Sequence, residues 1–169
     1  MLVFPASMWA IMLMLRTLSN EGIVVFTCVF YVGNLGGNIT VFGDRYYNIG
    51  IKKPFYDNEI SATLKIKNKS ISTSGIYERY FESNGKLYHH ILDTNTGYPV
   101  DTDLYSATVI GECSTDCDAL ATICVLYGEK RAKELINSTE NFEAVFIDKD
   151  YRITVTDGLK AENGVIKEK

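Results

Sequence analysis

The sequence predicts an α+β fold, in which a largely antiparallel sheet of many strands is joined by a few helices. Short runs rich in β-branched and aromatic residues follow one another between Ile39 and Gly111. Asn84-Gly85 separates two of these runs and is a typical two-residue hairpin turn. After these runs, helical spacing of apolar residues appears between Asp116 and Asn137. Strands in such quick succession favour antiparallel pairing, because parallel strands need long crossovers.

The composition indicates one globular domain. The chain has 169 residues, of which 46% are hydrophobic and 12% aromatic, which suits a packed core. Its formal net charge is -4, whereas a protein that binds nucleic acid usually presents a basic face. Lys65, Lys67 and Lys69 alternate along an expected strand, either as a solvated face or as an edge that steers anions. We therefore expect no nucleic-acid partner.

The first fifteen residues are almost entirely apolar. This stretch is too short for a transmembrane helix, and it lacks the positive segment that opens a secretory signal. The spacing of Ile11, Leu15 and Leu18 predicts a short amphipathic helix, which Gly22 ends.

The segment from Ile23 to Tyr31 is a continuous apolar run and predicts a strand buried on both faces. It leads into Gly36-Gly37-Asn38, where paired glycines either let the backbone approach an anionic ligand or form an ordinary tight turn. Ser74-Gly75 predicts a bulge or bend. The other expected strands before the helices are Ile39–Phe42, Tyr46–Ile51, Ile60–Ile66, Ser70–Thr73, Ile76–Phe81, Leu87–Leu92 and Tyr105–Gly111.

Two consecutive helices are expected next. Ser114 or Thr115 caps the first, which begins near Asp116 and ends at Gly128. The second runs from about Glu129 to Asn137.

The chain is expected to close with a hairpin of Phe142–Ile147 and Tyr151–Thr156, followed by a polar tail from Asp157 that frays. The four cysteines include the i, i+4 pair Cys113 and Cys117, but their spacing matches no zinc pattern and predicts structural thiols.

Asp118 and Thr122 are the first candidates for chemistry. Their i, i+4 spacing places a carboxylate and a hydroxyl on one face of the first turns of a helix. Such oxygen ligands suit Mg²⁺, which shares its coordination with water and substrate phosphates, and the helix dipole favours phosphate there. The alternative is a capping aspartate, a role that Asp116 could also fill, with a threonine bonded to a backbone carbonyl.

The chain's two histidines, His89 and His90, are the second candidates. On a strand they point to opposite faces, so only one is expected to reach a cleft. Asp93 follows where the strand enters a turn, and it is either a catalytic group or the first residue of that turn. A histidine near a carboxylate and a metal serves as a general base or binds phosphate; otherwise it packs on the sheet.

Four motifs occur in the order and spacing of one known family. They are Asn34-Leu35-Gly36-Gly37-Asn38-Ile39, Thr73-Ser74-Gly75, His89-His90-Ile91-Leu92-Asp93 with Thr96-Gly97-Tyr98-Pro99, and Asp118-Ala119-Leu120-Ala121-Thr122. Together they resemble the ApbE family of FAD:protein FMN transferases, or flavin-trafficking proteins. The resemblance extends from about Leu18 to Tyr151 and is to the C-terminal half of such proteins. It implies a single domain fragment, with 1–17 as an aberrant or truncated start, 18–156 as the family-like region and 157–169 as the tail.

The resemblance implies an α+β fold with a duplicated strand–helix–multistrand unit. It also implies an enzyme that uses Mg²⁺ to cleave FAD at its pyrophosphate and attaches FMN by a phosphoester to a serine or threonine of an acceptor protein; some members instead hydrolyse FAD to FMN and AMP. It assigns Asp118 and Thr122 to Mg²⁺, and His90 to the role of base or FAD contact. The residues that it places at FAD are Gly36, Gly37, Asn38, Ser74, Gly75, His90, Ile91, Asp93, Thr96 and Gly97.

The chain also departs from the family pattern. Thr94 stands where the family usually has proline, and no counterpart of the family's N-terminal half or of its Lys-Gly-Tyr helix is legible. Family members are usually extracytoplasmic and attached to the cytoplasmic membrane, although the start of this chain shows no convincing export signal. Two other functions are consistent with the sequence: a remnant that binds a nucleotide without turnover, and an interaction domain that pairs a sheet edge with a partner.

Overall fold

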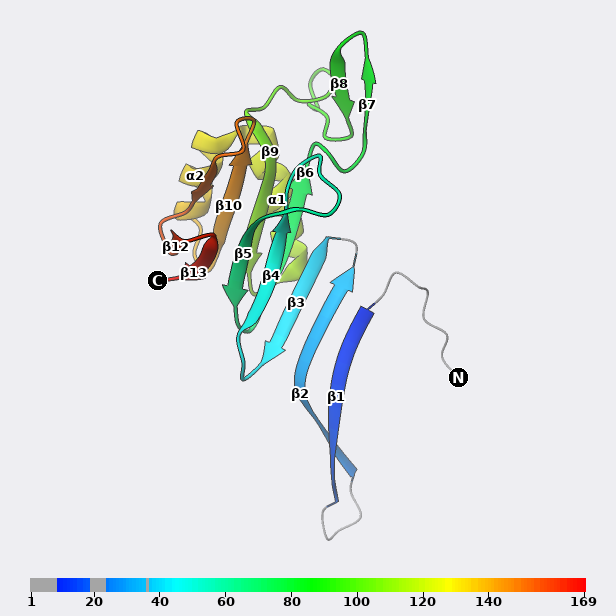
Figure 1. The fold of residues 1–169 in the computed structure, drawn as a ribbon, viewed down its shortest axis with the longest axis vertical. Coiled ribbons are helices and arrows are strands. Elements are labelled where there is room, and N and C mark those ends of the chain that lie inside the picture. Colours follow the sequence, from blue (N-terminus) through cyan, green and yellow to red (C-terminus); the bar gives the residue numbers. More distant parts are fainter. Residues whose placement is uncertain (1–8, 19–23, 36) are drawn as a thin grey trace.

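The computed structural model describes residues 9–18, 24–35 and 37–169, with only the backbone described in the first two ranges. In these residues, seven strands form an antiparallel sheet in the order β1-β2-β3-β6-β9-β10-β11 (Figure 1). The strands are β1 (Trp9–Leu18), β2 (Val24–Leu35), β3 (Asn38–Gly43), β6 (Lys69–Gly75), β9 (Leu104–Gly111), β10 (Glu143–Asp148) and β11 (Ile153–Val155).

The remaining described strands form two smaller sheets. One has the order β12-β13-β5-β4 and comprises β12 (Leu159–Glu162), β13 (Val165–Glu168), β5 (Ile60–Ile66) and β4 (Tyr47–Lys52). The other is the hairpin of β7 (Tyr80–Ser83) and β8 (Lys86–His89), which stands away from the main body in Figure 1. The described helices are α1 (Ser114–Tyr127) and α2 (Glu129–Asn137), neither of which is long and apolar enough to cross a membrane.

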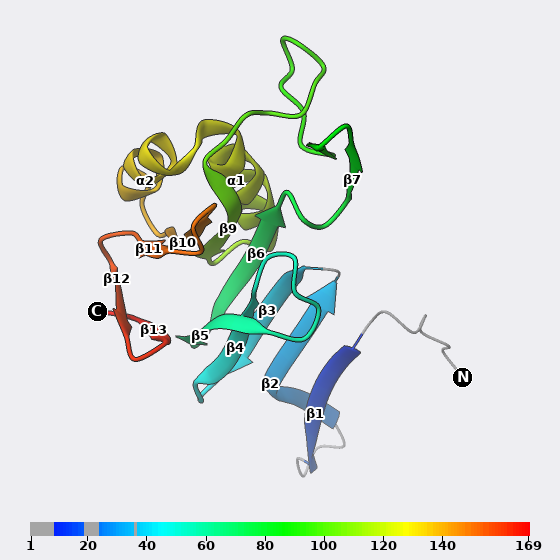
Figure 2. The same ribbon diagram turned by 45° about the horizontal axis from the view of Figure 1, so that its top comes forward.

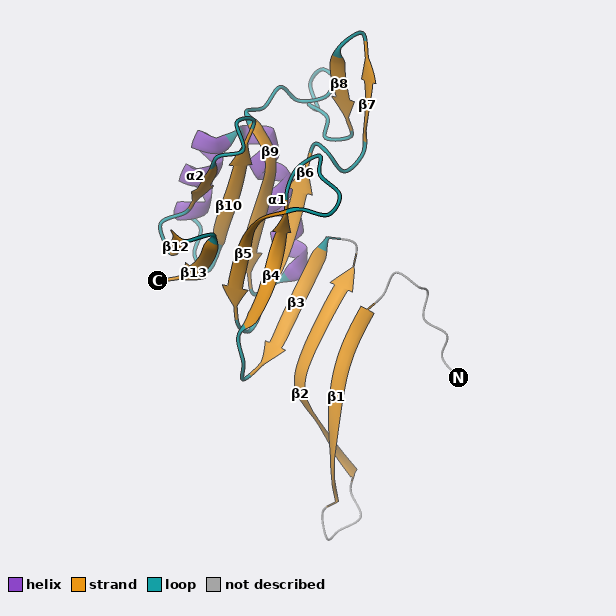
Figure 3. Ribbon diagram, in the orientation of Figure 1, coloured by secondary structure: helices purple, strands orange, loops and turns teal. Residues whose placement is uncertain are grey.

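The large sheet is the middle of three layers (Figures 2 and 3). On one face, Ala107, Val109 and Phe146 pack with buried side chains of α1 such as Cys117 and Ala121. On the other face, a second apolar cluster joins the large sheet to the four-stranded one; it includes Ile71, Ile110, Val145, Ile147, Leu64 and Ile166. Alternating side chains thus bury both faces of the part of the sheet that includes β9 and β10. The α+β class predicted from the sequence is confirmed.

The prediction of a helix near the start is wrong, because residues 9–18 form β1. This strand pairs antiparallel with β2, from Trp9 opposite Asn34 to Leu18 opposite Val24, with one register shift. A short apolar run does not distinguish a helix from a buried strand by its spacing, and here the neighbouring strand β2 supplies the backbone partners. The expected stop at Gly22 lies outside the described residues.

The prediction of a strand directly after Gly75 is also wrong. Ile76–Phe81 is not one strand: residues 76–79 turn and β7 begins at Tyr80. Of the bulge or bend predicted at Ser74-Gly75, the bulge is absent, because β6 pairs with β9 without a register shift as far as Gly75 opposite Ser106, and the chain turns directly after Gly75. The next expected strand ends early, at His89. The Asn84-Gly85 turn is confirmed, since both residues have positive φ (51° and 72°), as a type I′ turn requires.

The tail and the helix caps differ from expectation. β13 pairs parallel with β5, and Leu159 and Ile166 anchor the last strands in the core, so the tail does not fray. Cys113, rather than Ser114 or Thr115, is the N-cap of α1, and no side chain caps it.

Candidate functional site

Two serines of β6 face α1. Side chains alternate along a strand, so Ser72 and Ser74 share one face of the sheet while Ile71 lies in the cluster on the other. The Ser72 hydroxyl donates a hydrogen bond to Asp118 Oδ1 at 2.9 Å, and Ser74 Oγ lies 3.0 Å from Thr122 Oγ1. Two residues of strand span about 6.7 Å and four residues of helix about 6 Å. The matched spacing lets parallel β6 and α1 make both contacts.

The hydroxyl of Thr122 is already oriented. It donates to the backbone carbonyl of Asp118 at 3.3 Å, which leaves the Ser74 hydroxyl to donate to Thr122 Oγ1. This bond to the carbonyl is one part of the alternative expected from the sequence; the other part, a capping aspartate, is not observed, since no side chain caps α1. A hydroxyl that donates once and accepts once retains a free lone pair, so the same Thr122 oxygen can still bind a cation.

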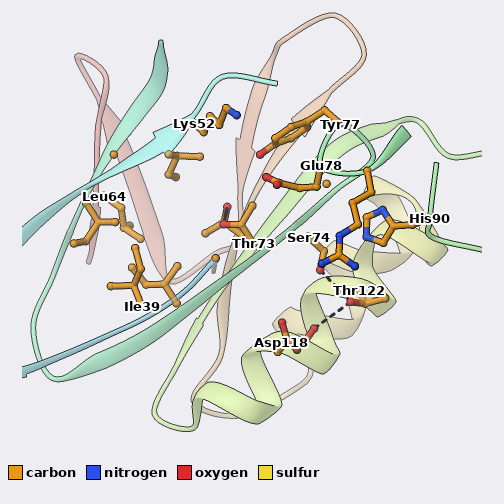
Figure 4. Close-up of a pocket in the computed structure, with 18 residues that line it drawn as sticks. Ile39, Lys52, Leu64, Thr73, Ser74, Tyr77, Glu78, His90, Asp118 and Thr122 are labelled. Atoms are coloured by element: carbon orange, nitrogen blue, oxygen red, sulfur yellow. Dashed lines mark hydrogen bonds between the residues drawn. The ribbon is translucent and has the colours of Figure 1, made fainter. Parts of the chain in front are cut away.

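A cleft of about 620 Å³ lies beside these contacts. The turn between β2 and β3 contributes Gly37, β6 contributes Ser74 and Gly75, α1 contributes Asp118 and Thr122, and His90 completes this side of the cleft. Figure 4 shows Asp118 and Thr122 on α1 near Ser74 and His90, with apolar side chains such as Ile39 and Leu64 on the opposite side. The cleft therefore has one polar and one apolar side.

The neighbouring histidines have different surroundings, although they do not share a strand: β8 ends at His89, and His90 lies just beyond it. His90 is exposed and lines the cleft, and its backbone N–H donates to the Arg79 carbonyl at 3.1 Å. His89 is buried and lines a different cavity, and its Nδ1 has no partner among the described residues. Burial lowers the pKa of His89, although a hydrogen bond to the Val100 backbone opposes this effect. Burial at His89 therefore favours the neutral imidazole.

Other predicted FAD contacts lie outside the cleft lining. Asp93 accepts the backbone N–H of Asn95 at 2.8 Å and closes the exposed turn that carries Thr96 and Gly97. Ile91 belongs to the core.

In the glycine loop, Gly37 lines the cleft with φ at 112°, and the buried Asn38 Oδ1 has no partner among the described residues. The remaining loop residue, Gly36, lies outside the described residues.

The cleft also contains residues that the sequence did not single out. Lys52 and Arg79 add positive charge, and Glu78 adds negative charge. Tyr77 folds back over Gly75, and burial raises the pKa of this phenol to about 12. For the serine contacts, the sequence did contain a signal: Ser70, Ser72 and Ser74 recur at every second position. This spacing places their hydroxyls on one face of the strand and could have predicted a polar contact with the helix.

The oxygen-only chemistry of Asp118 and Thr122 fits Mg²⁺. No group of three or more His, Cys, Asp or Glu side chains converges among the described residues. A complete protein cage is therefore absent from the described part, whereas Mg²⁺ characteristically takes one or two protein ligands and completes its octahedron with water and phosphate. The Asp118 carboxylate and the Thr122 hydroxyl are suited to such a half-site.

The sequence matches the model of the ApbE family over residues 9–146. It is 41% identical over 124 residues to an FAD:protein FMN transferase of Klebsiella pneumoniae, covering 73% of this chain and 39% of that protein. Its identity to the FAD:protein FMN transferase of Treponema pallidum is 36% over 139 residues, covering 75% of this chain and 38% of the relative. The chain thus spans about two fifths of the length of these curated relatives.

Solved structures give the same result. The crystal structure of the ApbE protein from Thermotoga maritima has a TM-score of 0.65 and 29% identity, covering 76% of this chain and 42% of that one. The flavin transferase ApbE from Vibrio cholerae has a TM-score of 0.62 and 27% identity, covering 77% and 43%. Since the family model matches most of the sequence and the fold agrees, this chain belongs to the ApbE family.

Proposed function

We propose that the cleft is part of the active site of a Mg²⁺-dependent FAD:protein FMN transferase. The observation that carries the proposal is the pair of contacts Ser72–Asp118 and Ser74–Thr122, which holds a carboxylate and a hydroxyl at the cleft that His90 also lines. The relatives' names supply the substrate, FAD, and the product, an FMN-modified protein.

In the proposed reaction, a serine or threonine hydroxyl oxygen of the acceptor protein attacks the phosphorus of the FMN moiety. A new P–O bond forms to the acceptor, the P–O bond to the bridging pyrophosphate oxygen breaks, and AMP leaves with that oxygen. The acceptor hydroxyl gives up one proton. His90 is suited to accept it, because the imidazole is exposed at the cleft and its backbone is held by Arg79.

Asp118 and Thr122 would hold the metal ion, which when bound would offset the charge on the phosphate oxygens. Ser72 keeps the Asp118 carboxylate in place, and Ser74 does the same for the Thr122 hydroxyl. Arg79 and Lys52 add positive charge to the cleft lining, which favours a pyrophosphate substrate. The proposed site lies outside the cytoplasm at the membrane, as the family resemblance implies.

Transfer is tested by incubating the chain with FAD, Mg²⁺ and a candidate acceptor flavoprotein. Flavin that stays bound to the acceptor under denaturing conditions, with one AMP released per FMN attached, supports the proposal. Free FMN together with AMP, and no labelled acceptor, would instead identify an FAD hydrolase. FAD that stays intact in the presence of the folded chain would favour the non-catalytic remnant.

A further inference from the structure

The loop between β4 and β5 contains an unusual turn. The Tyr56 N–H donates to the Lys53 carbonyl at 3.2 Å, Pro54 occupies the second position and Phe55 the third, with φ at 63°. These are the features of a type II turn, whose third position normally carries glycine because a side chain disfavours positive φ. A phenylalanine there costs free energy, which other contacts must offset.

The ring of Phe55 supplies those contacts. Its centroid lies 5.0 Å from that of Tyr105 on β9 and 5.3 Å from that of Tyr80 at the start of β7, both in edge-on geometry. A third ring, Tyr77 at the end of the cleft, lies at 6.0 Å. Such pairs are favourable beyond their buried area. Phe55 therefore connects two segments that are distant in sequence from its own loop, residues 77–80 and β9.

A backbone hydrogen bond and ion pairs also join the two ends of the loop. The Lys53 N–H donates to the Glu59 carbonyl at 2.9 Å, and the Lys53 ammonium lies 2.7 Å from the Glu59 carboxylate. Lys52, which lines the cleft, forms an ion pair with Asp57 at 3.6 Å. These contacts close the base of the loop. The loop therefore holds Phe55 in place although Phe55 belongs to no strand.

The segment between β6 and β7 carries cleft residues, and it belongs to no strand. Residues 76–79 follow the end of β6, and Tyr77, Glu78 and Arg79 all line the cleft. The Ile76 N–H donates to Tyr105 at 3.0 Å, and the Arg79 carbonyl holds the backbone of His90. Phe55 touches Tyr77 and Tyr80, on either side of Arg79, but does not itself line the cleft.

From this geometry we propose that Phe55 is a positioning residue: its ring holds residues 76–80 against β9, and so fixes Arg79 and His90 at the cleft. The role of this arrangement in turnover rests on the proposed function, whereas the mechanical link does not. Because the third position of this turn normally carries glycine, two substitutions can separate the effect of the Phe55 ring from the effect of its positive φ. Phe55→Gly relieves the backbone and removes the ring, while Phe55→Ala removes the ring and keeps the unfavourable φ.

The test is amide hydrogen exchange of the full chain, measured by NMR. In Phe55→Gly the amides of Ile76 and His90 should exchange at least about tenfold faster than in the wild type, because the aromatic contacts are lost. The amides of α1 should keep their rates. The control is Tyr56→Ala, which removes the adjacent ring. This ring contacts Lys53 and Tyr151 instead of residues 76–80. In this variant the amide of His90 should exchange at the wild-type rate.

The activity measurement adds a second readout. FAD turnover should fall about tenfold in both Phe55 variants, since the same ring is lost in each, although Phe55→Gly should melt at the higher temperature. The Mg²⁺ concentration for half-maximal rate should stay constant because Asp118 and Thr122 lie on α1. Unchanged exchange at His90 in Phe55→Gly, or equal acceleration throughout α1, would overturn the proposal even if the wild type turned over no FAD.

Discussion

Replacing Gly75 with alanine should destabilise the protein through a single steric overlap. A Cβ added at Gly75 would lie 2.5 Å from Tyr77 Cε1 and 3.0 Å from both Cδ1 and Cζ, whereas carbon atoms in contact prefer about 3.5–4.0 Å. Tyr77 has little room to move, since it is 7% exposed and its ring packs beside Phe55. Overpacking of this kind costs about 1–3 kcal/mol.

Thermal unfolding followed by circular dichroism measures this cost. For a chain of this size, each kcal/mol lowers Tm by roughly 2–4 °C, so a central cost of about 2 kcal/mol corresponds to a loss of about 4–8 °C. The control is the same substitution in a Tyr77→Ala background, where the overlapping atoms are gone. There Gly75→Ala should cost less than about 0.5 kcal/mol. Equal costs in the two backgrounds would refute the reasoning.

Three further predictions concern other parts of the molecule. Gly128→Ala should destabilise by about 1–2 kcal/mol in urea unfolding, because φ is 74° and the new Cβ would lie 2.8 Å from Asp103 Oδ1. Stability should decrease as the pH falls through about 6.5, because the unfolded chain takes up a proton that buried His89 resists; His89→Gln should flatten this dependence between pH 8 and pH 5.5. Ser72→Ala should raise the Mg²⁺ requirement of FAD cleavage, since the Asp118 carboxylate loses its donor at 2.9 Å, and should leave FAD binding unchanged in fluorescence titrations.

Elements with distinctive local patterns could be predicted from the sequence. β5 begins and ends where its alternating apolar residues do, and α2 lies between Gly128 and Asn137 as expected. The strand at residues 9–18 could not be recognised, because its short apolar run fits either a helix or a strand until β2 is beside it. The last strands were missed for a similar reason: few apolar residues, among them Leu159 and Ile166, anchor a polar segment.

The candidate site was predictable where residues share one element and unpredictable where the fold brings elements together. Helical spacing placed Asp118 and Thr122 on one face. The expectation that only one histidine reaches the cleft agrees with the structure, although His90 lies beyond the end of β8 and strand alternation is not the cause. The partnership of α1 with β6 depends on tertiary packing, so Ser72 was not identified. Arg79 was missed because the turn after β6 was taken for a strand.

The most direct test of the proposed metal-dependent site is FAD conversion by the purified chain as a function of Mg²⁺ concentration, with separation of FAD, FMN and AMP. Asp118→Ala should abolish conversion. Asp116→Ala is the matched control, because this carboxylate lies two residues earlier on the same exposed helix start and does not line the cleft; it should behave as the wild type. FMN and AMP formed only by the wild type and Asp116→Ala would support the account. Equal conversion by Asp118→Ala, or no conversion by a folded wild-type chain, would contradict it.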